Sequence, residues 1–130
     1  MGKPKARNES ERLLLEWLRS KTTEYPQPAS AVLRAGSFYA PTPRPKNVKC
    51  GDSGRYYDNC KKLAEATGCN YCEGVALAAK HGLVKVHAWC IDPQANIIDP
   101  TWEEIGLAYL GLTEEEMAKF QSAFQKVMKS

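Results

Sequence analysis

The stretch VHAWCID (residues 86–92) decides the fold together with IIDPTW (residues 97–102), which follows after a short turn. Both stretches are rich in strand-forming residues, and Asp92-Pro93-Gln94-Ala95 has the composition of a turn, so we predict a β-hairpin with strands at 84–91 and 96–99. His87 would lie on the first strand and Asp99 would end the second, within reach of each other. A carboxylate that holds an imidazole in one tautomer is what a thiol or hydroxyl nucleophile needs from its base.

Each member of this pair also has a purely structural interpretation. His87 can be a core histidine that bonds to the backbone. Asp99 can simply cap the Asp-Pro-Thr turn that it begins. The expected closeness of the two residues favours a shared role. On an alternating strand His87 shares its face with Trp89, so Trp89 is a further candidate for the wall of a cleft.

The bulk composition indicates a single globular domain, residues 1–130. A chain of 130 residues with 43% hydrophobic and 25% charged residues can bury a core without a metal or disulfides. The net charge of +3 is small. Its basic excess gathers at 3–7 and 44–49, and we interpret residues 1–8 as a solvated basic tail. Nucleic acid is therefore not an expected partner.

The ends and the cysteines indicate a cytoplasmic protein with no cofactor. Residues 1–8 are charged and polar, and no apolar run reaches the length of a membrane span, so we expect no membrane association. Five cysteines in a reducing compartment are expected to be free thiols. Cys69 and Cys72 have CxxC spacing, but they precede a strand and lack a second ligand pair, so we expect no metal site there.

The periodic patterns predict three helices, at residues 10–22, 55–67 and 113–130. Ser10 is the expected cap of the first, and Gly68 the stop of the second. Thr113 and Glu116 form a capping box at the start of the third. The third helix carries an apolar stripe that we expect in the core: Met117, Phe120, Phe124 and Val127.

Two other segments complete the predicted organisation. Residues 25–48 hold five of the eight prolines, and we interpret them as a long irregular connection with one helical turn near 30–34. A strand is expected at 71–78, with Glu73 near its start. Glu73 could line a cleft, although an exposed carboxylate at a strand end is the commoner case.

Two thiols precede the hairpin and are candidates for the nucleophile. Cys60 lies one to two turns into the helix at 55–67, where the helix dipole favours a thiolate less than at the first turn. It could equally be a small buried core residue. Cys50 lies just before this helix, in the glycine-containing approach CGDSG.

Four motifs resemble a group of small phage and prophage proteins in the transglutaminase-like branch of the papain-like fold. They are Tyr71-Cys72-Glu73-Gly74, His87-Ala88-Trp89, Asp99-Pro100-Thr101-Trp102 and Tyr109-Leu110-Gly111. The resemblance spans residues 56–112. It implies an α+β fold with a papain-like core at 50–112, in which helices, including N- and C-terminal ones, pack on a small antiparallel sheet. It also implies a Cys-His-Asp triad with His87 as base and Asp99 as its orienter, and the cytoplasm of a bacterial host.

The resemblance places the nucleophile in two alternative registers. The phage group has Cys-aromatic-x-Asn-small followed by Leu-Ala, which matches residues 56–60 and puts Tyr56 at the cysteine. Broader transglutaminase-like proteins have Cys four residues before Ala, which Cys60 and Ala64 satisfy. The first register matches more residues. One hypothesis is therefore a thiol acyl-transfer domain that hydrolyses or transfers an amide or ester through Cys60 or Cys50. The alternative is a catalytically altered phage accessory or host-takeover module that binds a protein or peptide.

Overall fold

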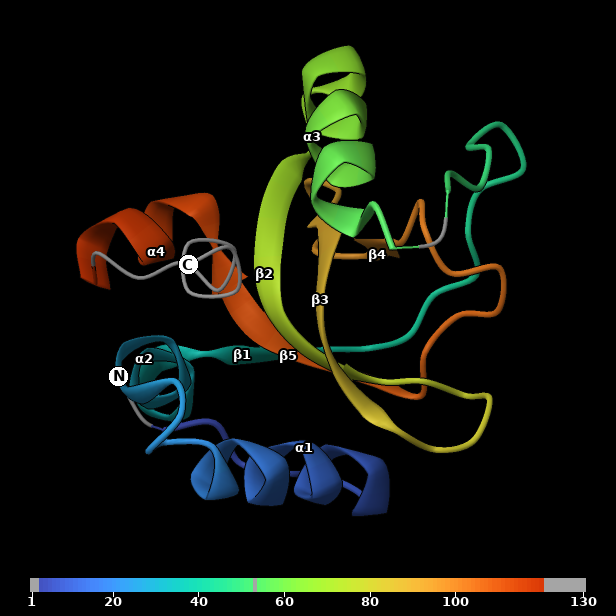
Figure 1. Ribbon diagram of the computed structural model, residues 1–130. Helices are drawn as coiled ribbons and strands as arrows, with labels where there is room; N and C mark the ends of the chain where they lie inside the picture. The colour runs from blue at the N-terminus through green and yellow to red at the C-terminus, as the bar shows by residue number, and fades with distance from the viewer. Residues whose placement is uncertain (1–2, 53, 121–130) are drawn as a thin grey trace.

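The computed structural model describes residues 3–52 and 54–120, the side chain of Phe120 excepted. Within these residues the protein is an α+β domain with four helices and five strands (Figure 1). In chain order they are α1 (Glu9–Ser20), α2 (Pro26–Ala35), β1 (Ser37–Tyr39), α3 (Tyr56–Thr67), β2 (Asn70–Leu77), β3 (Val84–Ile91), β4 (Ile97–Ile98), β5 (Ala108–Thr113) and α4 (Glu114–Phe120).

The strands form one antiparallel sheet in the order β1-β5-β2-β3-β4. Its long strands β2 and β3 bend strongly, so that the sheet curls (Figure 1). The predicted hairpin is confirmed, although β4 is only two residues long and pairs Ile98 with Cys90 and Ile97 with Ile91. At the centre of the sheet Gly74 lies opposite His87 on one side and opposite Gly111 on the other.

The two faces of the sheet are covered by different parts of the chain. Alternate side chains of β2, β3 and β5 pack against the helices, among them Val75, Ala88 and Leu110. The opposite set, which includes Trp89 and Tyr109, packs under the loop between β4 and β5. His87 belongs to this second set because it alternates with Ala88. The candidate site therefore lies between the sheet and a loop, on the face opposite Val75, Ala88 and Leu110, and Tyr56 at the start of α3 borders it.

The helix ends show which local signals decide the boundaries. Gly68 has a φ of 76° and ends α3 in the left-handed conformation, as expected. The capping box is also present, since Thr113 N–H donates to Glu116 Oε1 at 2.9 Å and Glu116 N–H donates to Thr113 Oγ1 at 3.2 Å. The predicted cap Ser10 is wrong. Asn8 caps α1 by accepting the Glu11 N–H at 2.9 Å. The part of the apolar stripe beyond Phe120 lies outside the described residues.

The segment 25–48 differs from the expected irregular connection. It contains α2 and β1, and only its second half lacks regular structure. Pro26 and Pro28 fall in the first turn of α2, where backbone N–H groups have no helical partner and a proline is tolerated. Val32 is then buried in the helical core, and Phe38 of β1 pairs with Leu110 of β5. Tertiary packing thus produces regular structure in a segment whose prolines predict an irregular connection.

Gly74 leaves no room for a Cβ between its strand and β5, so we predict a large effect of Gly74→Ala. A Cβ there would lie 2.1 Å from the carbonyl oxygen of Leu110 and 2.5 Å from Cα of Gly111, both backbone atoms. We expect the free energy of unfolding to fall by about 3 kcal/mol in urea titration. Gly82→Ala is the comparison, because its φ of 59° is strained but nothing lies within 4 Å, and it should lose about 1 kcal/mol. Equal losses would contradict the packing argument.

Candidate functional site

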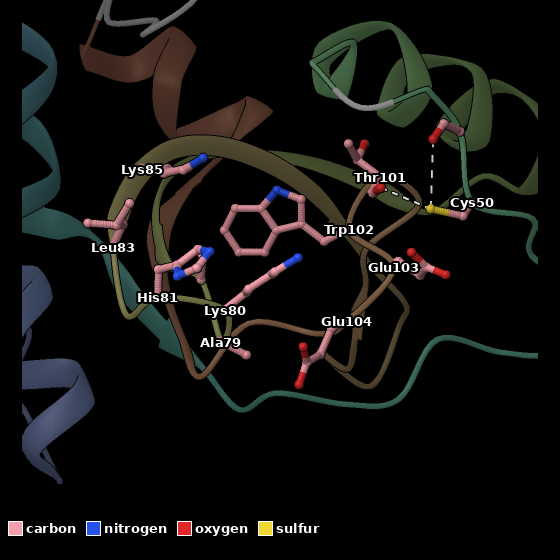
Figure 2. Close-up of a pocket in the computed structure, with 12 residues that line it drawn as sticks. Cys50, Ala79, Lys80, His81, Leu83, Lys85, Thr101, Trp102, Glu103 and Glu104 are labelled. Carbon is pink, nitrogen blue, oxygen red and sulfur yellow. Dashed lines mark hydrogen bonds between the residues drawn. The ribbon is translucent and has the colours of Figure 1, made fainter.

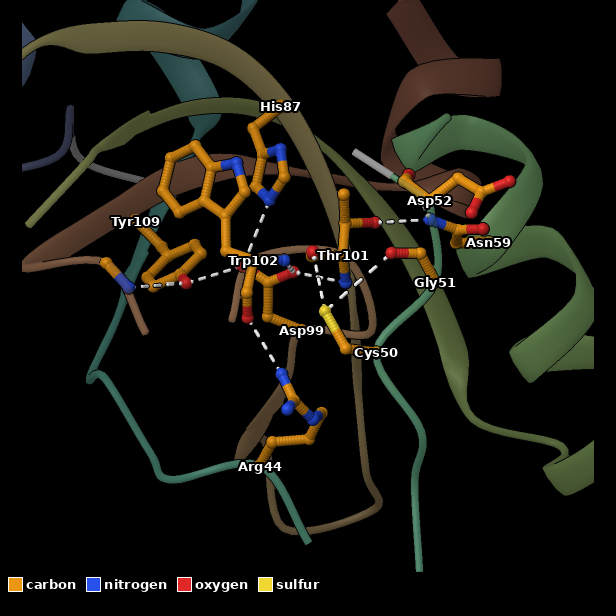
Figure 3. A network of polar contacts seen from close by, with 11 residues as sticks. Arg44, Cys50, Gly51, Asp52, Asn59, His87, Asp99, Thr101, Trp102 and Tyr109 are labelled. Atoms are coloured by element: carbon orange, nitrogen blue, oxygen red, sulfur yellow. Dashed lines mark hydrogen bonds and ion pairs between the residues drawn. The ribbon is translucent and has the colours of Figure 1, made fainter. Parts of the chain in front are cut away.

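Asp99 is the centre of a buried polar network (Figure 3). Its Oδ2 lies 2.9 Å from Nε2 of His87 and accepts the Tyr109 hydroxyl at 2.7 Å. Its Oδ1 accepts the backbone N–H groups of Thr101 at 3.0 Å and Trp102 at 3.2 Å. Asp99 therefore both pairs with His87 and caps the turn that follows it, so the two sequence interpretations hold at once.

These donors set the charge of Asp99. Burial by itself raises the pKa of this carboxyl, but the hydrogen bond and charge of His87, the Tyr109 hydroxyl and the Thr101 N–H together hold the pKa below its ordinary value. Asp99 is therefore a carboxylate at neutral pH. A carboxylate facing Nε2 requires a proton on that nitrogen, which leaves Nδ1 of a neutral His87 with its lone pair.

His87 is enclosed by aromatic rings. Its imidazole stacks on the indole of Trp102, with ring centroids 3.9 Å apart and an interplanar angle of 16°. The Tyr56 ring lies 5.3 Å from it, centroid to centroid. Nδ1 is buried and has no hydrogen-bond partner among the described residues. The arrangement thus orients the imidazole as a base, but shields the basic nitrogen from solvent.

Tyr56 is the first residue of α3. The structure thereby brings the residue that the phage-type register puts at the nucleophile into contact with His87. Burial raises the pKa of the Tyr56 hydroxyl, so this group stays protonated at neutral pH. A protonated phenol is a poor nucleophile.

Cys60 lies four residues later on α3 and is fully buried in the helical core. The Cys90 thiol donates to the Cys60 carbonyl oxygen at 3.3 Å. The neighbouring Cys90 thiol and burial both raise the pKa of Cys60 well above its ordinary range. No hydrogen bond joins Cys60 to His87 in the described structure. Cys60 therefore has the environment of an inert core thiol rather than of an activated nucleophile.

Cys50 is exposed and lies at the edge of the network. Its thiol donates to the Thr101 carbonyl oxygen at 2.9 Å, and the Gly51 N–H donates to the Pro100 carbonyl oxygen at 2.6 Å. Asn59 of α3 strengthens the same junction by donating to Thr101 Oγ1 at 3.0 Å. These bonds hold the approach to α3 against the turn after Asp99. The Cys50 sulfur bonds to a carbonyl oxygen there and not to the imidazole.

The remaining predicted cleft residues, Glu73 and Trp89, are both buried. Glu73 lies on the helix-facing side of β2, where it accepts the Tyr71 hydroxyl at 2.6 Å, so it is separated from His87 by the sheet. Trp89 shares the face of His87 and packs edge-on against Tyr109, with ring centroids 5.1 Å apart. Trp89 packs between the sheet and the site residues and does not reach an open cleft.

An open groove of about 680 Å³ borders the network (Figure 2). The turn between β2 and β3, Lys85 of β3 and the segment 101–104 form its walls, and Cys50 lies at one end. The Trp102 indole lies in the middle of the groove and stacks on His87, so it separates the imidazole from the groove. Arg44 fixes this loop by donating to the Trp102 carbonyl oxygen at 2.8 Å.

The sequence assigns no site role to three residues that belong to the network or its surroundings: Tyr109, Trp102 and Asn59. The only sequence signal for them is that each belongs to one of the motifs given above. Tyr109 reaches Asp99 only because β5 pairs with β2, a long-range contact that no local pattern marks. Its hydroxyl also accepts the Gly106 N–H at 2.9 Å and so ties the covering loop to the sheet.

No protein-family model, curated protein or solved structure matches this chain. Within the described residues no helix is long and apolar enough to cross a membrane. Nor does the described part of the chain gather three or more His, Cys, Asp or Glu residues in a geometry that could hold a metal ion. The fold and site define an α+β domain with a buried His–Asp pair beside an open groove.

Proposed function

We propose that this protein is a catalytically altered member of the transglutaminase-like branch of the papain-like fold, which binds a protein segment instead of transferring an acyl group. One observation carries the proposal. The first residue of α3, packed against the imidazole of the His–Asp pair, is Tyr56 and not a cysteine. The α+β layout and the His87–Asp99 pair agree with that branch, and a phage accessory or host-takeover role is the setting that the motifs suggest.

The retained pair has a structural use that explains its presence without catalysis. Asp99 joins β3, β5 and the covering loop through His87, Tyr109 and the amides of its own turn. This network holds the backbone of Trp102, whose indole lies in the middle of the groove. A tryptophan held rigidly in a groove is the kind of residue that dominates binding energy at protein interfaces.

Thiol acyl transfer through Cys50 is the second candidate function. Cys50 is an exposed thiol, and its hydrogen bond to the Thr101 carbonyl oxygen connects it to the network. In that reaction the Cys50 sulfur would attack an amide or ester carbonyl, and His87 would take the thiol proton and deliver it to the leaving amine or alcohol. Water or an amine would then release the acyl group from the thioester. The reaction requires Trp102 to leave His87.

Alkylation by iodoacetamide at pH 7 separates the two functions. We expect Cys50 to react at the rate of an ordinary exposed thiol, and equally fast in the native chain and in His87→Gln. The buried thiols of Cys60, Cys72 and Cys90 should stay protected, which reports that the variant is folded. Fast alkylation of Cys50 that slows at least about tenfold in His87→Gln would contradict the binding proposal and support acyl transfer.

A further inference from the structure

The outer edge of β3 is open next to the groove. β4 pairs only with Cys90 and Ile91, so no strand among residues 3–52 and 54–120 neighbours residues 84–89 on that side. The Ala78 N–H donates to the Leu83 carbonyl oxygen across the β2–β3 turn, and hydrogen bonds alternate along an antiparallel pair. Val84 and Val86 therefore direct their backbone N–H and carbonyl groups outward. Both residues are only partly buried.

The groove runs beside this edge and offers side-chain contacts as well. Leu83, 54% exposed, and Lys85 flank the outward-facing residues and line the groove with Trp102. An unpaired strand edge beside a groove is the arrangement that accepts an extended peptide, since the backbone supplies hydrogen bonds and the groove selects alternate side chains.

The charged side chains at the groove determine which peptides it favours. Lys80 and Lys85 lie on the side of the strand and the turn, and Glu103 and Glu104 on the opposite wall (Figure 2). All four side chains are exposed, and none makes an ion pair within the described part of the chain. A strand added at the edge of β3 lies beside Lys85, and the Lys80 side chain extends from the turn towards the middle of the groove (Figure 2).

We propose that the groove binds an extended peptide of a partner protein, which pairs with Val84 and Val86 and places an acidic side chain against Lys80 and Lys85. This inference rests on the proposed binding function and names the chemistry of its partner. A carboxylate at this position gains from two unpaired ammonium groups, whereas a peptide cation there is repelled.

Three synthetic heptapeptides test the proposal by isothermal titration calorimetry and by amide chemical shifts of the protein. The first is acetyl-Thr-Val-Thr-Glu-Thr-Val-Thr-amide, and the other two carry Gln or Lys in place of Glu. We expect the Glu peptide to bind about tenfold more tightly than the Lys peptide, with the Gln peptide between them. The largest shifts should occur at the amides of Val84 and Val86. Backbone N-methylation of the Glu peptide should weaken binding about tenfold, because it removes a ladder hydrogen bond.

Lys85→Gln is the matched protein variant, because it removes one exposed charge and leaves the strand intact. This variant should reduce the ratio of the affinities for the Glu and Lys peptides, and it should leave the affinity for the Gln peptide unchanged. Equal affinity for the three peptides, no effect of N-methylation, or no binding at all would overturn the proposal, as would pairing of this edge with a second copy of the chain in sedimentation. Such a failure leaves the alkylation rates of Cys50 in the native chain and in His87→Gln unchanged, so it is distinguishable from a failure of the altered-site proposal.

Discussion

Asp99→Ala is expected to lower the free energy of unfolding by about 3–5 kcal/mol. The substitution removes the acceptor of His87, of the Tyr109 hydroxyl and of the amides of Thr101 and Trp102, all at a fully buried position. Buried donors that lose their acceptor keep the full cost of desolvation. Urea unfolding at pH 7 measures the loss.

Asp99→Asn is the matched control for the charge. Its amide oxygen can still accept the backbone N–H groups of the turn, so this variant should be more stable than Asp99→Ala.

The pH dependence of the stability of Asp99→Asn adds a second readout. Because the folded-state pKa of Asp99 is lowered, its stabilisation is complete above the ordinary carboxyl pKa of about 4 and is lost as the pH falls through the folded value. The stability difference between the native chain and Asp99→Asn should therefore shrink from pH 6 to pH 2. If the Asp99→Ala protein is as stable as the native chain, the claim that the Asp99 network stabilises the fold is wrong.

The sequence alone could predict the parts of the fold that depend on neighbours in the chain. His87 and Asp99 lie on one hairpin, so strand alternation and one turn suffice to bring them together. Gly68 and the Thr113–Glu116 box also act within one helical turn. Such local signals are reliable because no distant contact is needed to satisfy them.

Other features depend on contacts that local patterns do not contain. α2 forms in the proline-rich segment because its apolar residues pack on the core, and β1 forms because β5 offers it an edge. β5 was not predicted as a strand, although it carries Tyr109 to Asp99. The burial of Glu73 follows from which face of β2 meets the helices, which is settled only by the assembled sheet.

The candidate site shows the same division. The pairing of His87 with Asp99 could be predicted from the sequence, but the sequence offers two registers for a nucleophile. The structure puts Tyr56 beside the imidazole and Cys60 in the core one turn later, where its thiol pKa is raised. The indole that closes His87 away from the groove could not be foreseen, because Trp102 is placed by the Asp99 cap and by Arg44.

If the proposed function is correct, Tyr56→Cys should place a reactive thiol beside His87. In a Cys50→Ser background, the new cysteine stands at the first residue of α3, where the helix N-terminus favours a thiolate, and beside His87, whose imidazole can accept the thiol proton. Asp58→Cys in the same background is the control, because it lies in the same first turn with an exposed side chain.

The rate of iodoacetamide alkylation at pH 6, followed by mass spectrometry, tests the central claim that Tyr56 occupies the place of a lost nucleophile. We expect Tyr56→Cys to react about ten- to a hundredfold faster than Asp58→Cys, and the addition of His87→Gln to remove most of this advantage. Equal rates for the two cysteines, or a fast reaction that His87→Gln leaves unchanged, would contradict the account.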